Sequence, residues 1–128
     1  MTLDEYIHTT LRDDATMHTL LGKVSTPYGI YREFAPETPD FPLITWEYLT
    51  SSEDIVETRR VVFTIYAKDV EPIMKRIRDL FQNKQQCLDD YGFRRMTKTN
   101  TIFGDFSDDF KIPSRKVEYT IYLIPKTY

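Results

Sequence analysis

Apolar residues recur at helical spacing through the first twenty residues of the chain. The stripe consists of Leu3, Ile7, Leu11, Met17, Leu20 and Leu21. This pattern predicts an amphipathic helix over Thr2 to Leu21, with Thr2 and Glu5 as a capping box and Gly22 as its stop. The Asp13-Asp14 pair is expected to interrupt it, leaving one helix and a shorter second turn.

A second helical stripe predicts a helix that begins at Asp69 and ends near Asn83 to Gln86. Asp69 is a favourable N-cap, and Pro72 falls in the first turn, where proline is tolerated. The apolar side of this helix consists of Ile73, Ile77, Leu80 and Phe81, and the polar side of Lys75, Arg76, Arg78 and Asp79. We interpret the polar side as a solvated face in preference to a nucleic-acid contact.

Three longer segments alternate between apolar and polar residues, which predicts β-strands: PLITWEYL, RRVVFTIYAK and RKVEYTIYLIP. A fourth strand is expected over FRRMTKTNTIF, with both faces partly polar, and a shorter strand over Ile30 to Phe34. Together with the helices they predict a single α+β domain over residues 1–128, a mainly antiparallel sheet packed by two helices in the order α-β-β-β-α-β-β. The second face of such a sheet is left for water or a partner. Tyr48, Tyr66 and Tyr122 are expected to lie partly on that face, depending on strand register.

Three prolines are spaced three residues apart between the strand at Ile30 to Phe34 and the one that follows. Pro36, Pro39 and Pro42 each fix φ and favour extended geometry in the preceding residue. We interpret this segment as a rigid link between two strands. A ligand for a proline-reading domain is the less favoured alternative.

Composition narrows the classes of function. The formal net charge of −3 argues against general affinity for DNA or RNA. The single cysteine, Cys87, excludes an intrachain disulfide and fits a reducing compartment. The N-terminus is acidic and periodic where a signal peptide would be basic and continuously apolar, and no apolar run approaches the length of a membrane span. We therefore expect synthesis and folding in a cytoplasm.

Residues able to carry catalysis are few and scattered. His8 and His18 are ten positions apart, too far for a chelating pair on one helix, and the acidic neighbours of Cys87 would raise the pKa of its thiol. The aspartates of the run Asp105 to Asp109 lack the spacing of a calcium-binding loop. We therefore expect no catalytic residue, cofactor or metal site, and a protein that is not an enzyme.

The order of the expected elements carries a resemblance. A first helix ends in the LLG of Leu20-Leu21-Gly22, an IY strand follows at Ile30-Tyr31, and a proline-bearing connector enters PLITWEYL. The succession is completed by a long strand, RRVVFTIYAKD, then a helix, EPIMKRIRDLF, and then an acidic segment with the closing strand, DFSDDFKIPSRKVEYTIYLI. From about Leu3 to Ile124 the chain resembles the tail terminator, or tail completion, proteins of long-tailed bacteriophages, which include tail-to-head joining proteins.

The resemblance implies a structural subunit that assembles, usually six at a time, into a ring on the end of a finished tail tube. Such a ring ends tube polymerisation and gives the head connector a surface to join. Its partners would be further copies of itself, the tail tube protein and the head connector or completion protein. DNA would pass through the bore without specific binding, and no membrane is involved. The expected location is the head-proximal end of the tail in the virion, and the host cytoplasm during assembly.

The segments expected to contact neighbours are the polar one from Thr50 to Thr58 and the acidic one from Asp105 to Lys111. The candidate interface residues are Ser51, Ser52, Glu53, Asp54, Phe106, Asp108, Asp109 and Phe110, with Tyr48 and Tyr66. Phe106 and Phe110 are the expected anchors, although packing under their own segment is equally favoured. Two alternative functions stay open, another neck or head-completion protein, and a small-molecule-binding regulatory module of the same fold class.

Overall fold

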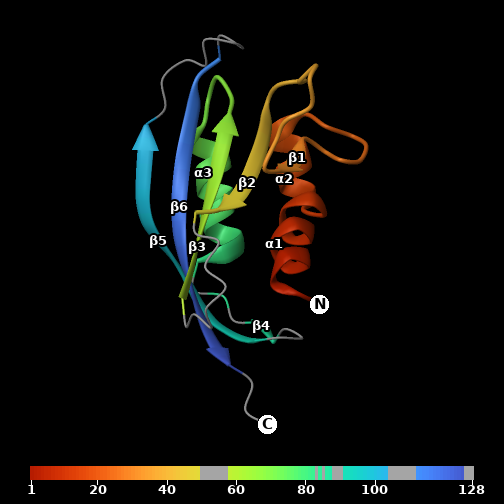
Figure 1. Ribbon diagram of the computed structural model, residues 1–128. Helices are drawn as coiled ribbons and strands as arrows, with labels where there is room; N and C mark the ends of the chain where they lie inside the picture. Colours follow the sequence, from red (N-terminus) through yellow and green to blue (C-terminus); the bar gives the residue numbers. More distant parts are fainter. Residues whose placement is uncertain (50–57, 83, 85, 88–90, 104–111, 126–128) are drawn as a thin grey trace.

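The computed structural model describes residues 1–49, 58–82, 84, 86–87, 91–103 and 112–125. Within those residues, three helices pack against one six-stranded mixed sheet (Figure 1). The elements are α1 (Leu3–Arg12), α2 (Ala15–Leu21), β1 (Ile30–Arg32), β2 (Leu43–Tyr48), β3 (Thr58–Tyr66), α3 (Glu71–Phe81), β4 (Gln86–Cys87), β5 (Tyr91–Phe103) and β6 (Ser114–Pro125). The fold is α+β, as predicted. The expected order omitted the short strand β4 and counted the divided first helical region as one helix.

The first helical region divides because an aspartate caps a new helix. Thr2 caps α1 by accepting a hydrogen bond from the Glu5 backbone N–H at 3.2 Å. The Asp14 carboxylate accepts one from the Met17 N–H at 2.8 Å, and this N-cap begins α2. Gly22 ends α2 in the left-handed region, with φ at 65°. The Thr2 half of the expected capping box, the interruption at Asp13-Asp14 and the stop at Gly22 are confirmed.

The N-cap predicted for α3 is wrong. The capping position is Val70, with no side-chain hydrogen bond to the helix, and Asp69 lies one residue before it. The reason lies in Pro72, whose fixed φ and missing N–H suit the first turn, so that the helix begins immediately before it. The predicted apolar stripe is confirmed, since Ile73, Ile77 and Phe81 are buried.

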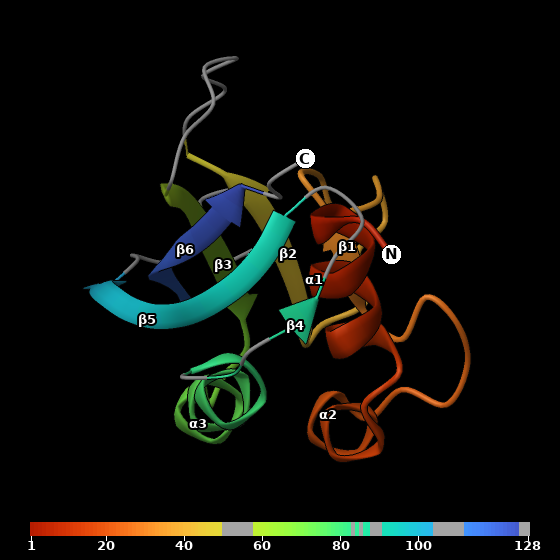
Figure 2. The ribbon, with the colours of Figure 1, turned by 90° about the horizontal axis from the view of Figure 1, so that it is seen from below.

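The sheet has the strand order β1-β2-β3-β6-β5-β4, and all neighbours are antiparallel except β1 and β2. Because β1 and β2 run parallel, the chain must return from the end of one to the start of the other. The segment that makes this return is the one that carries the prolines, so its interpretation as a link between two strands is confirmed. Figure 2 shows the helices on one side of the sheet and the strong curvature of β5.

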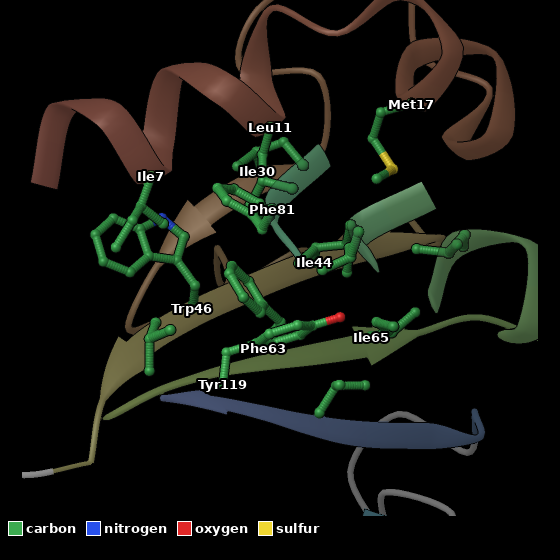
Figure 3. Packing of buried hydrophobic residues seen from close by; sticks show 14 of the residues in the cluster. Ile7, Leu11, Met17, Ile30, Ile44, Trp46, Phe63, Ile65, Phe81 and Tyr119 are labelled. Carbon is green, nitrogen blue, oxygen red and sulfur yellow. The ribbon is translucent and has the colours of Figure 1, made fainter. Parts of the chain in front are cut away.

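The core lies between the helices and the three central strands. Phe63 on β3 is fully buried, with its ring centroid 5.3 Å from that of Phe81 on α3 and 5.7 Å from that of Tyr119 on β6 (Figure 3). The predicted alternation is confirmed, because every second residue of these strands enters the core. These residues are Ile44 and Trp46 on β2, Val61, Phe63 and Ile65 on β3, and Val117, Tyr119, Ile121 and Leu123 on β6.

The opposite face of the central strands differs from the expectation that it is open. Five residues on that face, Leu43, Thr45, Val62, Thr64 and Glu118, are buried. The Glu118 carboxylate is paired with the Arg60 guanidinium, which satisfies its charge. The centre of this face therefore offers little exposed area to a partner.

Register also assigns the three tyrosines to faces. Tyr66 pairs with Leu43, and Tyr122 with Thr58, so both lie on the face away from the helices and are half-buried. Tyr48 pairs with Val61 and lies on the helix-covered face. The expectation that Tyr48 lies on the second face is wrong, because it shares the alternation of Trp46, which enters the core.

Candidate assembly surface

Most of the residues expected at an interface lie outside the described part of the chain. Ser51, Ser52, Glu53, Asp54, Phe106, Asp108, Asp109 and Phe110 all belong to this group. Tyr48 and Tyr66 are described, and the structure places them apart. Tyr48 is at the last residue of β2 and Tyr66 at the last residue of β3, at opposite ends of an antiparallel pair.

Tyr48 belongs to a polar network that joins β2 to α1. Its hydroxyl donates a hydrogen bond to Asp4, whose other carboxylate oxygen accepts one from Arg32 Nη1 at 2.9 Å. Burial raises the pKa of Tyr48 far above its ordinary value, and the neighbouring Asp4 carboxylate raises it further. The Tyr48 hydroxyl therefore stays protonated and acts as a donor at any physiological pH.

Two arginines lie over the aromatic rings of the same region. The Arg32 guanidinium is 4.9 Å from the centroid of Trp46 and 5.7 Å from that of Tyr48, and that of Arg59 is 5.1 Å from Tyr48. These distances are those of cation–π contacts. We call Asp4, His8, Arg32, Trp46, Tyr48 and Arg59 the aromatic–arginine cluster.

His8 completes the cluster from α1. Its Nδ1 accepts a hydrogen bond from the indole Nε1–H of Trp46 at 3.1 Å, so this nitrogen carries no proton. Burial lowers the pKa of His8, and the positive charges of Arg12 and Arg32 lower it further, outweighing the opposite effect of Asp13. The cluster thus ties α1, β1, β2 and β3 together at one end of the sheet.

Three exposed apolar residues lie close to members of this cluster in the sequence. Of the four large apolar residues that are exposed among the described residues, three lie within three positions of a cluster member in the sequence. These are Met1 near Asp4, Phe34 near Arg32 and Leu49 after Tyr48; the fourth, Val24, lies between α2 and β1. We call Met1, Phe34 and Leu49, together with the cluster, the end surface.

Phe34 is the member of the end surface that the sequence did not predict. The strand expected over Ile30 to Phe34 ends at Arg32, because Glu33 adopts a left-handed φ of 70° and turns the chain away from the sheet. The Phe34 side chain is 80% exposed as a result. Its backbone position is fixed nonetheless, since the Glu33 N–H donates to the Trp46 carbonyl at 2.9 Å and the Phe34 N–H to the Arg32 carbonyl at 2.8 Å.

An apolar pocket of about 280 Å³ opens at the other end of the sheet. It lies where β2 begins, where β3 ends, and beside α2 and α3. Its lining consists of Leu20, Phe41, Pro42, Ala67, Lys68, Asp69, Ile73 and Ile112. The ring of Phe41 lies 6.1 Å from that of Tyr66, which brings one of the predicted interface residues beside the lining of this pocket.

The remaining candidates from the sequence do not come together. His18 stacks on Tyr28, with ring centroids 3.6 Å apart, whereas His8 faces Trp46. No group of three or more histidine, cysteine, aspartate or glutamate residues in the described segments is placed to hold a metal ion. In the same segments, none of the helices has the length and apolar character needed to cross a bilayer.

Comparison with models of known protein families found no match, and comparison with curated proteins found none either. The function proposed below therefore rests on the chain's own residues and on the resemblance in the order of its elements.

Proposed function

We propose that this chain is a structural subunit of a long-tailed bacteriophage that caps the tail tube as a ring. The ring, six-membered as the resemblance implies, ends tube polymerisation and gives the head a surface to join. The proposal makes the chain a virion protein of the head-proximal end of the tail, without catalytic activity. Its partners are further copies of itself, the tail tube protein and the head connector.

The observation that carries the proposal is the end surface. It combines exposed apolar residues with Arg32, Arg59 and the half-buried ring of Tyr48, residue types that contribute most at protein interfaces, while Trp46 is buried in the core. An isolated subunit leaves Phe34 and Leu49 in water, at 80% and 43% exposure respectively. Such a subunit gains free energy when a partner covers these two side chains. A surface of this composition favours an assembling protein over a protein that acts alone.

The rigidity of the subunit is the second observation that supports the proposal. A closed ring requires that every subunit hold the same angle between its two interfaces, because small errors accumulate around the ring. Here the aromatic–arginine cluster fixes α1 to three strands, and the bidentate pair of Asp14 and Arg76 fixes α2 to α3. Helices held to the sheet and to one another in this way suit a building block of defined geometry.

Two alternative functions are a neck protein and a small-molecule-binding regulatory module. A neck or head-completion protein would use the same kind of surface on the connector side of the joint. A regulatory module would instead bind a small molecule, and the pocket beside Ile73, with its volume of about 280 Å³, is the observation that favours it. This volume is close to the lower end of the range typical of ligand sites. A thermal-shift screen with nucleotides and amino acids tests this module directly, and a stabilising compound would support it.

The proposal is tested by electron microscopy of a lysate in which this gene carries an early stop codon. Overlong or headless tails beside DNA-filled heads are the expected result, and a suppressor host should restore normal particles. Tails of normal length that only fail to join heads would move the protein to the neck. Intact infectious particles would refute a role in assembly.

A further inference from the structure

We infer that Phe34 of one copy inserts into the apolar pocket of a neighbouring copy, so that subunits join head to tail. The pocket is the one lined by Leu20, Phe41, Pro42, Ala67 and Ile73, among others. This inference deepens the proposed function and rests on it for the identity of the partner, a second copy of this chain. The two halves of the subunit contact are then Phe34 and this pocket.

Phe34 is presented to solvent by an ordered turn. Two backbone hydrogen bonds hold it, one from Glu33 to the Trp46 carbonyl and one from Phe34 to the Arg32 carbonyl. The turn requires a left-handed conformation at Glu33, which is strained for a residue other than glycine. A fold that keeps this strain to hold an apolar ring outward has a pre-organised anchor, for which little conformational entropy is lost on binding.

The pocket fits a phenyl ring in size and chemistry. Apolar residues, with Lys68 and Asp69, line a volume of about 280 Å³. A closed apolar cavity of about 150 Å³ is already sufficient to hold benzene. The larger and open pocket here therefore accommodates one phenylalanine side chain with room for its approach.

Phe34 and the pocket are at opposite ends of the same subunit. Phe34 comes two residues after Arg32, which pairs with Trp46 on β2, while the pocket residues Pro42 and Ala67 flank the paired residues Leu43 and Tyr66. Leu43 and Trp46 alone are separated by roughly 10 Å along the strand. One subunit cannot fill its own pocket, so a second copy must supply the ring. Because Phe34 and the pocket are at opposite ends, a heterologous contact, the type that generates rings, is favoured over a reciprocal two-fold pair, which would stop at the dimer.

Charge favours the same pairing. Glu33 and Glu37 are exposed on either side of Phe34, whereas Asp40 at the end of this segment is paired with Lys23 at 3.1 Å. The cation at the pocket is Lys68, which is also exposed, with Asp69 beside it. The glutamates are attracted by Lys68 and repelled by Asp69, which fixes orientation and not affinity, because these charges lie at the rim of the contact.

Cysteine cross-linking tests the contact directly. Ala35→Cys, which keeps Phe34 in place, is combined with Lys68→Cys in a Cys87→Ser background and treated with a short bis-maleimide at high protein concentration. A head-to-tail contact gives a ladder of dimers, trimers and larger species, whereas either cysteine alone gives at most dimers. The control pair is Val24→Cys with Lys68→Cys, since Val24 is 93% exposed and lies outside the end surface. A ladder from both pairs, or from neither, would overturn the inference.

Sedimentation velocity then separates this inference from the proposed ring. Phe34→Ser should weaken self-association on the order of tenfold or more, with an unchanged melting temperature, while Val24→Ser should change neither. Lys68→Glu should weaken association, and adding Glu33→Lys and Glu37→Lys should restore it. Wild-type self-association that persists in Phe34→Ser would refute the contact and leave the ring standing. A wild-type chain that stays monomeric and never cross-links would remove both.

Discussion

Tyr48, at the end of β2, donates a hydrogen bond to Asp4, in the first turn of α1, across 44 residues of sequence. This bond connects the end of the sheet to the first helix and forms one side of the aromatic–arginine cluster. A hydrogen bond to a charged acceptor contributes more to stability than one between neutral groups. The arrangement of side chains in the end surface therefore depends on this hydrogen bond within the subunit.

Tyr48→Phe should lower the free energy of unfolding by about 1–2 kcal/mol, because it removes one hydrogen bond to a carboxylate and leaves the ring in place. The measurement is urea denaturation followed by circular dichroism, in which the midpoint should fall and the slope stay constant. Tyr31→Phe on the neighbouring strand β1 is the matched control. An unchanged midpoint for Tyr48→Phe would show that the bond to Asp4 contributes nothing to stability.

Tyr119→Phe also removes a tyrosine hydroxyl, but here we expect no loss of stability. The Tyr119 side chain is fully buried, its hydroxyl has no hydrogen-bond partner among the described residues, and burial raises its pKa to about 12. Removing an unsatisfied buried hydroxyl should leave stability unchanged or raise it by up to about 1 kcal/mol. The urea midpoint should therefore stay or rise, and a clear fall would reveal a partner for the hydroxyl in solution.

Asp14 should make stability depend on pH in the acid range. The hydrogen bonds from Arg76 hold the pKa of Asp14 below its ordinary value. The stabilisation from Asp14 is therefore complete above about pH 4 and is lost as the pH falls through the lowered pKa. Asp14→Asn keeps an N-cap acceptor but loses the ion pair, and should cost about 1–2 kcal/mol at neutral pH. Thermal unfolding at several pH values should show the two proteins converging in acid.

The control for this series is Asp13→Asn, which alters an exposed carboxylate paired with its neighbour Arg12. Its effect at neutral pH should be smaller, because exposed ion pairs contribute little. If Asp14→Asn and wild type differ by the same amount at pH 7 and in strong acid, the ion pair is not the source of the difference.

The fluorescence of Trp46 should report the protonation of His8. Trp46 is the single tryptophan in the chain, and its indole donates to the unprotonated Nδ1 of His8. Because the pKa of His8 is lowered, the neutral form should persist below about pH 6.5, and stability should fall as the pH drops from there through the lowered pKa. A fluorescence titration should show a midpoint below the ordinary histidine value of about 6.5.

His8→Gln should abolish this fluorescence transition, and His18→Gln should retain it, because His18 stacks on Tyr28, away from Trp46. A transition that survives His8→Gln would assign it to another group.

The repeating patterns were the predictable part of this fold. Periods of 3.6 and 2 located the helices and the long strands, since burial of one side imposes these periods whatever the tertiary arrangement. The parallel pairing of β1 with β2 has no local signal, because strand direction is decided by where the chain must return. Long-range contacts such as that between Trp46 and His8 also have no local sequence signal, since they depend on how α1 is placed on the sheet.

Phe34 shows why the sequence predicts only part of the end surface. The sequence IYREF continues an alternating pattern, which predicts a strand that includes Phe34. A left-handed turn at a glutamate carries no sequence signal of the kind that glycine or asparagine would supply. Exposed phenylalanine among acidic residues indicates a contact. This holds for Phe34 as it does for Phe106 and Phe110, which lie outside the described residues.

The short first strand has a consequence for how the chain behaves when many copies accumulate. β1 lies at one edge of the sheet and is only three residues long, and the turn at Glu33 ends it abruptly. Free edges of long strands act as templates on which further chains add, which leads to fibrous aggregates. So short an edge exposes few unpaired backbone groups, and concentrated stocks of this protein should stay free of amyloid-type growth from that side.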